Sequence, residues 1–162
     1  MRQMAKKPAA THDRVIENRK ARHDYHILET VECGVILRGP EVKALRQGLA
    51  TITDGYVRAN AQPLELTAFG IDIQPYGPAG PRQHNPKRAR GLLAHKREII
   101  RLAKQAEDKG MTLVPLKLYF KNGYAKVLVG VARGKQAHDK RRAIADRESK
   151  RDLARAISKR AR

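Results

Sequence analysis

The chain has one cysteine and no tryptophan. A single cysteine, Cys33, excludes an internal disulfide and any metal site built from several thiolates. Hydrophobic runs stay well short of the roughly 20 residues that cross a bilayer, and the N-terminal segment lacks the apolar core of a secretion signal. These absences predict a cytoplasmic protein in which Cys33 is buried as a small hydrophobic residue.

Acidic residues are scarce relative to basic ones. The sequence has 35 Lys and Arg residues against 16 Asp and Glu, which gives a formal net charge of +19. This excess is larger than solubility requires and predicts a polyanionic partner, nucleic acid above all. An anionic membrane is the alternative, but no amphipathic helix with a bulky apolar face accompanies the charge, so we expect no membrane partner.

Catalytic and metal-binding motifs are also missing. The sequence has no GxSxG, P-loop, GxGxxG or HExxH pattern. On a strand, His23 and His26 would point to opposite faces, which is poor geometry for one metal ion. Glu29, Glu32 and Glu41 are scattered among basic neighbours, whereas a nuclease needs positioned carboxylates for its metal ions. We therefore expect no enzyme activity, no metal and no cofactor.

The clearest structural signal is a β-hairpin. Residues 113–121 and 124–131 are rich in β-branched and aromatic residues, and Asn122-Gly123 joins them. Asn-Gly tolerates the positive φ angles of a type I′ turn, and a two-residue turn determines register. That register places an apolar set on one face: Leu116, Leu118, Phe120, Ala125, Val127 and Val129. The other face interleaves tyrosines with lysines: Lys117, Tyr119, Lys121, Tyr124 and Lys126, with Leu128 among them.

The remaining segments predict short strands and two helices. Strands are expected at 25–33, 35–37, 51–53, 56–59 and 64–73, a helical turn at 15–20, a short helix from Gly39 to Gly48, an irregular loop at 75–86 and a long helix at 92–109. At 162 residues the chain is long enough for one domain with a hydrophobic core. We predict a mainly β fold: an OB-like closed barrel of about six strands with flanking α-helices.

The two ends of the chain differ from this middle. Residues 1–13 are small, polar and basic, and we expect a disordered arm before a domain at 14–134. Residues 135–162 are good helix formers, but their apolar set is thin: Ile144, Leu153 and Ile157. A helix with so little apolar surface has nothing to pack on, so we expect this basic tail to be disordered until it binds a polyanion.

Basic residues gather in three clusters. The first holds Arg19, Lys20 and Arg22, the second Lys87, Arg88 and Arg90, and the third is the tail. One run of charge usually marks a solvated surface, but three clusters with so large an excess favour RNA. Tyr25, Tyr119 and Tyr124 are candidates either for stacking on bases or sugars or for half-buried packing.

Several motifs together resemble the SmpB family of SsrA-binding proteins, the protein partners of transfer-messenger RNA. They are NRKARHDY at 18–25, GVILRGPEVKALRQG at 34–48, HNPKRARGLLAHKREI at 84–99, LVPLKLYFKNGYAKVLVGVARGK at 113–135 and DKR at 139–141. They occur in the family's order through most of the chain. Long motifs in a set order are far more specific than any one of them.

The resemblance implies a role in trans-translation, the rescue of bacterial ribosomes stalled on messages without a stop codon. It implies an OB-like barrel that binds the tRNA-like end of transfer-messenger RNA through His23, Tyr25, Glu32 and Leu93. The complex would travel with elongation factor Tu and GTP into an empty A site. The family's decoding-centre elements match Gly134, Lys135, Asp139, Lys140 and Arg141, and the tail from Arg142 onward would fold as a helix in the vacant mRNA channel.

Residue patterns and resemblance together define the predicted RNA contacts. They are Arg19, Arg22, His23, Tyr25, Glu32, Lys87, Arg88, Arg90, Leu93, Tyr119, Tyr124 and Lys126. We expect a monomer. A basic ribosomal or ribosome-assembly protein is the alternative and would also bind RNA, and a metal-dependent RNA-cleaving enzyme is the third hypothesis.

Overall fold

The computed structural model describes residues 14–160, so the arm predicted at 1–13 lies outside the described residues. Its strands are β1 (Ile16–Glu17), β2 (Tyr25–Val35), β3 (Ala50–Thr51), β4 (Tyr56–Ala61), β5 (Leu64–Phe69), β6 (Asp72–Ile73), β7 (Arg90–Leu93), β8 (Met111–Lys121) and β9 (Tyr124–Gly134). Its helices are α1 (Arg19–Asp24), α2 (Gly39–Arg46), the 3-10 helix η1 (Gly77–Arg82), α3 (Lys96–Glu107) and α4 (Ala137–Arg160).

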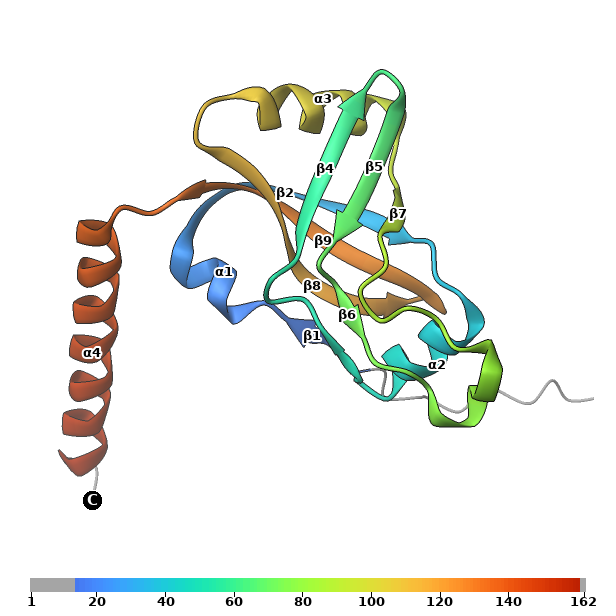
Figure 1. The fold of residues 1–162 in the computed structure, drawn as a ribbon. Helices are drawn as coiled ribbons and strands as arrows, with labels where there is room; N and C mark the ends of the chain where they lie inside the picture. The colour runs from blue at the N-terminus through green and yellow to red at the C-terminus, as the bar shows by residue number, and fades with distance from the viewer. Residues whose placement is uncertain (1–13, 161–162) are drawn as a thin grey trace, which may run out of the picture.

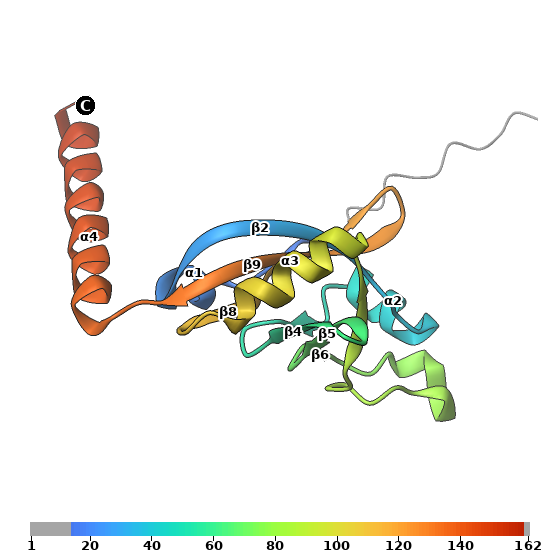
Figure 2. The same ribbon diagram turned by 90° about the horizontal axis from the view of Figure 1, so that it is seen from above.

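Seven strands form one antiparallel sheet in the order β1-β8-β4-β5-β7-β2-β9, and β8 also pairs with β9. β3 and β6 form a separate two-stranded sheet. Figure 1 shows α3 lying across one end of β4 and β5, and Figure 2 shows β2 and the β4–β5 pair on opposite sides of the molecule. The prediction of a mainly β fold with flanking helices is confirmed.

The main core lies inside the curved sheet and is closed off by α2 and α3. Its fully buried side chains include Leu45 from α2, Leu102 from α3, Leu118 from β8 and Val127 from β9. Cys33 is also fully buried there, as predicted, and burial raises the pKa of its thiol to about 11. The thiol therefore stays protonated and packs as a small apolar group.

The β8–β9 hairpin follows the predicted register only in part. Asn122 and Gly123 have φ angles of 52° and 81°, as a type I′ turn requires, and the pairing is as predicted from the turn to Lys117. Beyond it Val129 pairs with Pro115 instead of Leu116, because a β-bulge inserts one extra residue into β8. Proline lacks the N–H that the ladder needs and is found at such bulges.

The bulge moves Leu116 out of the main core. The prediction that it shares a face with Leu118 is wrong: Leu116 packs in a second cluster with Val114, Ala132 and Ala21. Ala21 belongs to α1, so this second cluster is the contact by which α1 covers one end of the hairpin.

Other predicted elements also differ. The strand predicted at 64–73 is two strands in separate sheets, β5 and β6. The long helix predicted at 92–109 starts at Lys96, because Leu92 and Leu93 belong to β7. The helical turn predicted at 15–20 is the short strand β1 followed by α1. The loop at 75–86 contains η1. The short helix after Gly39 is confirmed as α2, and Gly48 follows it with a φ of 77°.

A buried ion cluster joins α2 to β7. The Arg90 side chain donates from Nε to Glu41 Oε1 at 3.0 Å, and Arg88 Nε donates to the same oxygen at 2.8 Å. The side chains of Glu41 and Arg90 are both fully buried. Burial alone would raise the pKa of Glu41, but hydrogen bonds from Arg88 and from the Arg38 backbone, with the charge of Arg90, hold it below its ordinary value.

This cluster corrects one predicted RNA contact. Arg90 also donates hydrogen bonds to the carbonyl groups of Ile71, Arg88 and Pro86, so its guanidinium is enclosed by the protein and cannot reach RNA. The prediction is wrong because the partner carboxylate lies 49 residues away in the sequence. Arg88 is 21% exposed and is largely committed to Glu41.

Replacing Glu41 by glutamine tests how much the ion cluster contributes to the free energy of unfolding. Glu41→Gln leaves the Arg90 guanidinium buried without its counter-charge, and we expect the free energy of unfolding at pH 7 to fall by about 3–5 kcal/mol in urea denaturation. Because the pKa of Glu41 is lowered in the folded state, its contribution is complete above about pH 4.3 and is lost as the pH falls through the folded-state pKa. The difference between the two proteins should therefore narrow in acid.

An exposed ion pair provides the control. Lys20 and Asp54 approach to 3.5 Å, with side chains 60% and 83% exposed. Asp54→Asn should change the free energy of unfolding by less than about 0.5 kcal/mol. If Glu41→Gln were no more damaging than Asp54→Asn, the ion cluster would not be a structural link.

Candidate nucleic-acid interface

Four strands display side chains in rows on the outer side of the sheet. The first row crosses β7, β2, β9 and β8 as Leu93, Gly34, Lys126 and Tyr119, and the second crosses β2, β9 and β8 as Glu32, Leu128 and Lys117. Side chains alternate along strands, so both rows lie on one face, and Cys33, Val127 and Leu118 between them point into the core. We call these two rows, with Lys121 and Tyr124 at the hairpin end, the outer face.

The outer face brings together five of the predicted RNA contacts: Glu32, Leu93, Tyr119, Tyr124 and Lys126. Leu93 is 61% exposed although it is apolar. Its side chain lies against Gly34, where an added Cβ would sit 3.4 Å from the Cβ of Leu93. Gly34 is thus the cross-strand neighbour of Leu93, and an added Cβ there would make only an ordinary van der Waals contact. An exposed leucine suits contact with the apolar face of a base or sugar.

Glu32 is the electrostatic centre of the outer face. The Tyr119 hydroxyl donates to Glu32 Oε2 at 2.5 Å, and Lys121 Nζ approaches the same oxygen at 3.1 Å. The hydrogen bond from Tyr119, followed by that from Lys121, lowers the pKa of Glu32. Burial, together with Glu32, raises the pKa of Tyr119 to about 12. At neutral pH the carboxylate is therefore charged and the phenol holds its proton.

The three tyrosines are not equivalent. Tyr119 is half-buried and its hydroxyl is bound to Glu32. Tyr25 is half-buried and packs against the second cluster beside Ile27. Tyr124 is 72% exposed. Packing therefore accounts for Tyr25, whereas Tyr124 presents a ring that can stack on a base.

Helix α1 places the first basic cluster beside the outer face. Asn18 caps α1 by accepting a hydrogen bond from the Ala21 N–H at 2.9 Å, and its amide donates to the carbonyl groups of Ile52 and Pro115, both at 3.1 Å. Arg19 and Arg22 are exposed, and His23 Nδ1 lies 3.0 Å from Asp24 Oδ1. We did not single out Asn18, although asparagine before a helix is a recognised capping signal.

The start of the tail is anchored to the same region. Gly134 pairs with Tyr25, and Lys135 donates from its backbone N–H to the Asp24 carbonyl at 2.9 Å and from Nζ to the Arg22 carbonyl at 3.2 Å. His26 Nε2 lies 3.7 Å from Asp139 Oδ2. The predicted decoding-centre residues Gly134, Lys135 and Asp139 therefore lie next to α1.

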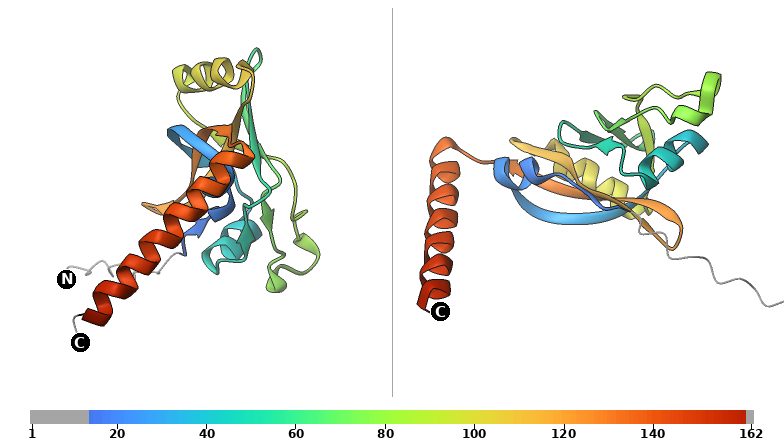
Figure 3. Two further views of the ribbon diagram at one scale, coloured as in Figure 1. Left: turned by 90° about the vertical axis from the view of Figure 1, so that its left-hand side faces the viewer. Right: turned by 90° about the horizontal axis from the view of Figure 1, so that it is seen from below.

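Beyond this anchor α4 extends away from the sheet, as Figures 1 and 3 show. Ile144, Leu153 and Ile157 are 42%, 64% and 62% exposed, and Arg141 and Arg142 are exposed. The side chain of Lys140 is outside the described part of the structure. The tail is thus helical in the structure, whereas we expected disorder in the free protein; that disorder stays a prediction.

Lys87 is the one exposed residue of the second basic cluster. Arg90 is buried and Arg88 is half-buried, so this cluster does not form a single basic surface. Lys87 precedes β7, whose last residue, Leu93, belongs to the outer face. The RNA-binding prediction is retained for Lys87 but not for Arg90.

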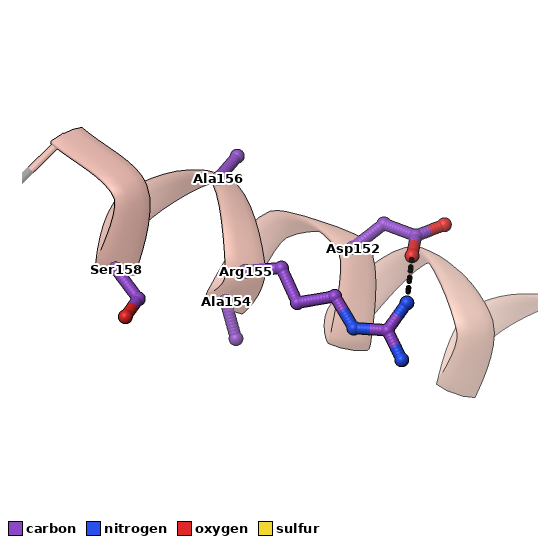
Figure 4. Close-up of a pocket in the computed structure, with 5 residues that line it drawn as sticks. All are labelled: Asp152, Ala154, Arg155, Ala156 and Ser158. Atoms are coloured by element: carbon purple, nitrogen blue, oxygen red, sulfur yellow. Dashed lines mark ion pairs between the residues drawn. The ribbon is translucent and has the colours of Figure 1, made fainter.

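The described residues include no group of three or more His, Cys, Asp or Glu side chains placed to hold a metal ion. None of the described helices is long and apolar enough to cross a membrane. A hollow of about 650 Å³ on α4 is lined by Asp152, Ala154, Arg155, Ala156 and Ser158 (Figure 4). All five belong to one exposed helix, so this hollow is an open surface and not a binding cavity.

The protein is mainly β, with lysines and an exposed tyrosine on one face, and it continues into a basic helix. These features are typical of the class of small, basic nucleic-acid-binding proteins. Comparison with known proteins narrows this class. The SmpB protein family matches residues 15–159. The chain therefore belongs to the SmpB family.

Individual relatives cover almost the whole chain. The SsrA-binding protein of Pelotomaculum thermopropionicum is 49% identical over 148 residues, or 91% of this chain and 95% of that protein. The SsrA-binding protein of Staphylococcus haemolyticus is 47% identical over 157 residues, or 97% and 99%. A solved structure described as "tmRNA-SmpB: a journey to the center of the bacterial ribosome" is 50% identical, with a TM-score of 0.64 over 76% of this chain and 85% of that one.

Removing the Tyr119 hydroxyl tests the electrostatic centre. Tyr119→Phe should raise the pKa of Glu32, because the hydrogen bond from Tyr119 is the largest cause of its lowering. A carboxyl 13C NMR titration measures this. Tyr124→Phe, at a 72% exposed ring on the same face, should leave the pKa of Glu32 unchanged. Equal titration of Glu32 in wild type and Tyr119→Phe would contradict the assigned hydrogen bond.

Proposed function

We propose that this protein binds the tRNA-like domain of transfer-messenger RNA and delivers it to stalled bacterial ribosomes in trans-translation. The observation that carries the proposal is the match to the SmpB family over residues 15–159, with relatives named as SsrA-binding proteins. The neighbouring solved structure, of tmRNA and SmpB with the bacterial ribosome, supports the same two partners. This match favours a rescue factor over a ribosomal or ribosome-assembly protein.

We infer that residues 14–134 form a closed OB-like barrel. The pairings run β8-β4-β5-β7-β2-β9, and β9 pairs again with β8 along most of its length. A ring of pairings leaves fewer free strand edges than an open sheet, with β1 outside the ring, and it gives a curved surface. Such a surface suits recognition of folded RNA by shape, in which charge supplies affinity and the preformed surface supplies selectivity.

The outer face and α1 together form the proposed RNA-binding surface. Lys126, Arg19 and Arg22 contact phosphates, and Tyr124 stacks on a base. The ionised Glu32 accepts hydrogen bonds from base amino groups or 2′-hydroxyls, and it repels a phosphate placed wrongly. Leu93 fills the apolar gap between these polar contacts, and His23 lies at the edge nearest the tail.

The tail is the proposed sensor of an empty mRNA channel. Gly134, Lys135, Asp139, Lys140, Arg141 and Arg142 approach the decoding centre, and the rest of 135–162 enters the channel as a helix. In the free protein a helix whose apolar residues are exposed has little tertiary stabilisation, so the tail is disordered there. A channel filled with message excludes it sterically, and only a stalled ribosome admits it.

The remaining partners follow from this role. Elongation factor Tu with GTP associates through the RNA and not through a dedicated surface of this protein. The protein acts as a monomer in the cytoplasm, where ribosomes translate. It is not an enzyme, since its contribution is binding and positioning.

Truncation after Gly134 separates the two parts. We expect binding of the tRNA-like RNA to change by no more than about threefold, because charges beyond a Debye length of roughly 8 Å contribute little, while peptide tagging of stalled products is lost. A gel-shift assay and a reconstituted tagging assay measure the two effects. Loss of specific RNA binding on truncation would show that body and tail do not divide the work in this way.

Lys126→Ala tests the outer face directly. Removing one phosphate contact should weaken binding to the tRNA-like RNA and reduce the slope of log affinity against log salt by about 1. Lys104→Ala, at an exposed lysine on α3, is the matched control and should leave both quantities unchanged. Equal effects of the two variants would mean that binding depends on net charge and not on the outer face.

A further inference from the structure

The β4–β5 hairpin has an outward side on the opposite part of the molecule from β2, as Figures 1 and 2 show. Three pairs of residues face each other across it: Tyr56 and Phe69, Arg58 and Thr67, Asn60 and Glu65. The alternating residues Val57, Leu66 and Ala68 are 5%, 2% and 0% exposed and belong to the core. The six outward residues therefore form one flat surface, which we call the hairpin face.

Aromatic and guanidinium groups lie together at one end of the hairpin face. The rings of Tyr56 and Phe69 are stacked, with centroids 5.2 Å apart and an interplanar angle of 15°. The guanidinium carbon of Arg58 lies 5.6 Å from the Phe69 centroid. Tyr56 is nevertheless 45% exposed. Phe69 is half-buried and supports one face of the Tyr56 ring. An exposed tyrosine beside an arginine is a group on which a nucleic-acid base can stack.

Polar groups surround a shallow hollow next to these rings. The hollow measures about 240 Å³ and is lined by Arg58, Asn60, Glu65, Thr67, Phe69 and Ala89. This is below the roughly 300–1,000 Å³ of typical small-molecule sites, so a single planar ring fits it better than a larger ligand. Thr67 Oγ1 donates to Glu65 Oε1 at 3.1 Å, and the Asn60 amide offers both a donor and an acceptor to a base edge.

The surrounding charge favours a nucleotide over a neutral ring compound. Ala89 lines the hollow, and the exposed Lys87 precedes it by two residues. Arg58 lines the hollow and can pair with the phosphate of a nucleotide whose base is stacked, and Lys87 is two residues from the lining in the sequence. The Glu65 carboxylate also lines the hollow and accepts a hydrogen bond from Thr67. Lys87 has no place on the outer face, so this arrangement also gives a role to the exposed member of the second basic cluster.

We propose that the hairpin face is a second RNA site, which stacks the base of an unpaired nucleotide independently of the outer face. The inference rests on the proposed function in taking RNA as the partner, but not on which RNA the outer face binds. A flat face with one ring pair and one arginine suits single-stranded nucleotides, because a paired base in a duplex has its faces covered by its neighbours.

The two phenylalanines of the chain allow a direct test. Full-length protein carrying 4-fluorophenylalanine gives 19F signals from Phe69 and Phe120. Phe120 is a matched internal control, since its ring also has an arginine over it, Arg46 at 5.1 Å, but lies on β8. On titration with a ten-nucleotide oligoadenylate RNA, we expect the Phe69 signal to shift with saturation and the Phe120 signal to stay in place.

Two variants show whether the site is separate. Arg58→Gln changes an exposed side chain and leaves the core intact, and it should weaken oligoadenylate binding about fivefold or more, as loss of a stacking contact does. Its binding to the tRNA-like RNA should not change. Lys126→Ala should weaken binding of the tRNA-like RNA. Its Phe69 shift and its oligoadenylate affinity should be the same as in wild type.

Several results would overturn the proposal: no shift at Phe69, equal shifts at Phe69 and Phe120, or loss of the Phe69 shift in Lys126→Ala. Binding of the tRNA-like RNA by wild type is measured in parallel. If that RNA binds while oligoadenylate leaves Phe69 unmoved, the second site fails and the proposed function stands. If oligoadenylate binds and the tRNA-like RNA does not, the proposed function fails and the hairpin face stands.

Discussion

The ladder in which β9 pairs with β2 on one side and β8 on the other determines the outer face and the place where the tail begins. Its registered pairs align Lys126 with both Gly34 and Tyr119, so the outer face is a direct result of backbone hydrogen bonding. The same ladder ends at Gly134 opposite Tyr25, which places the tail beside α1. Register therefore sets both the position of the proposed RNA-binding surface and the place where the tail begins.

Two bulges change which side chains of this ladder face the main core and which face α1. One lies in β2 between Ile27 and Glu29, and the other in β8 between Pro115 and Lys117. Gly130 of β9 lies between them: an added Cβ would sit 2.8 Å from Leu116 Cδ1 and 3.3 Å from Ile27 Cγ2. A bulge bends its strand and turns a side chain to the other face. Glycine at this position lets Leu116 and Ile27 turn outward, where α1 covers them and the exposed outer face ends.

The sequence predicted those parts that depend on local chemistry. Asn122-Gly123 gave the turn, and with it the opposite faces of Tyr119 and Leu118. Prediction from sequence failed where residues distant in the chain decide the role of a side chain. In the sequence Arg90 looks like an RNA-contacting arginine, because it lies in a basic cluster. Its partner Glu41 lies on another element, and their buried hydrogen bond gives Arg90 a structural role. Leu92 and Leu93 suit a helix and a strand equally well. The Glu98 carboxylate accepts a hydrogen bond from the His95 N–H at 2.9 Å, but histidine is not one of the usual residues before a helix, so the helix start had no clear signal in the sequence.

Some basic side chains of this protein are paired with carboxylates, and others are exposed to solvent. This division explains how a protein with a net charge of +19 can still select one RNA shape over another. Arg90 and Arg88 are held by Glu41, Lys121 by Glu32, and Lys117 by Glu17, whose pKa the lysine lowers. These pairs give the sheet a patterned surface in place of a uniform positive field. Both α1 and α4 carry exposed arginines, among them Arg22 and Arg142, and Lys135 joins the start of α4 to α1. We expect a body with such pairs to discriminate between RNA shapes, and a basic helix without them to bind any polyanion within its reach. Lys135 holds the start of that helix against α1. The position of the tail therefore depends on how the body is bound to its RNA. A body that binds only the correct RNA shape would also bring the tail only to the correct site.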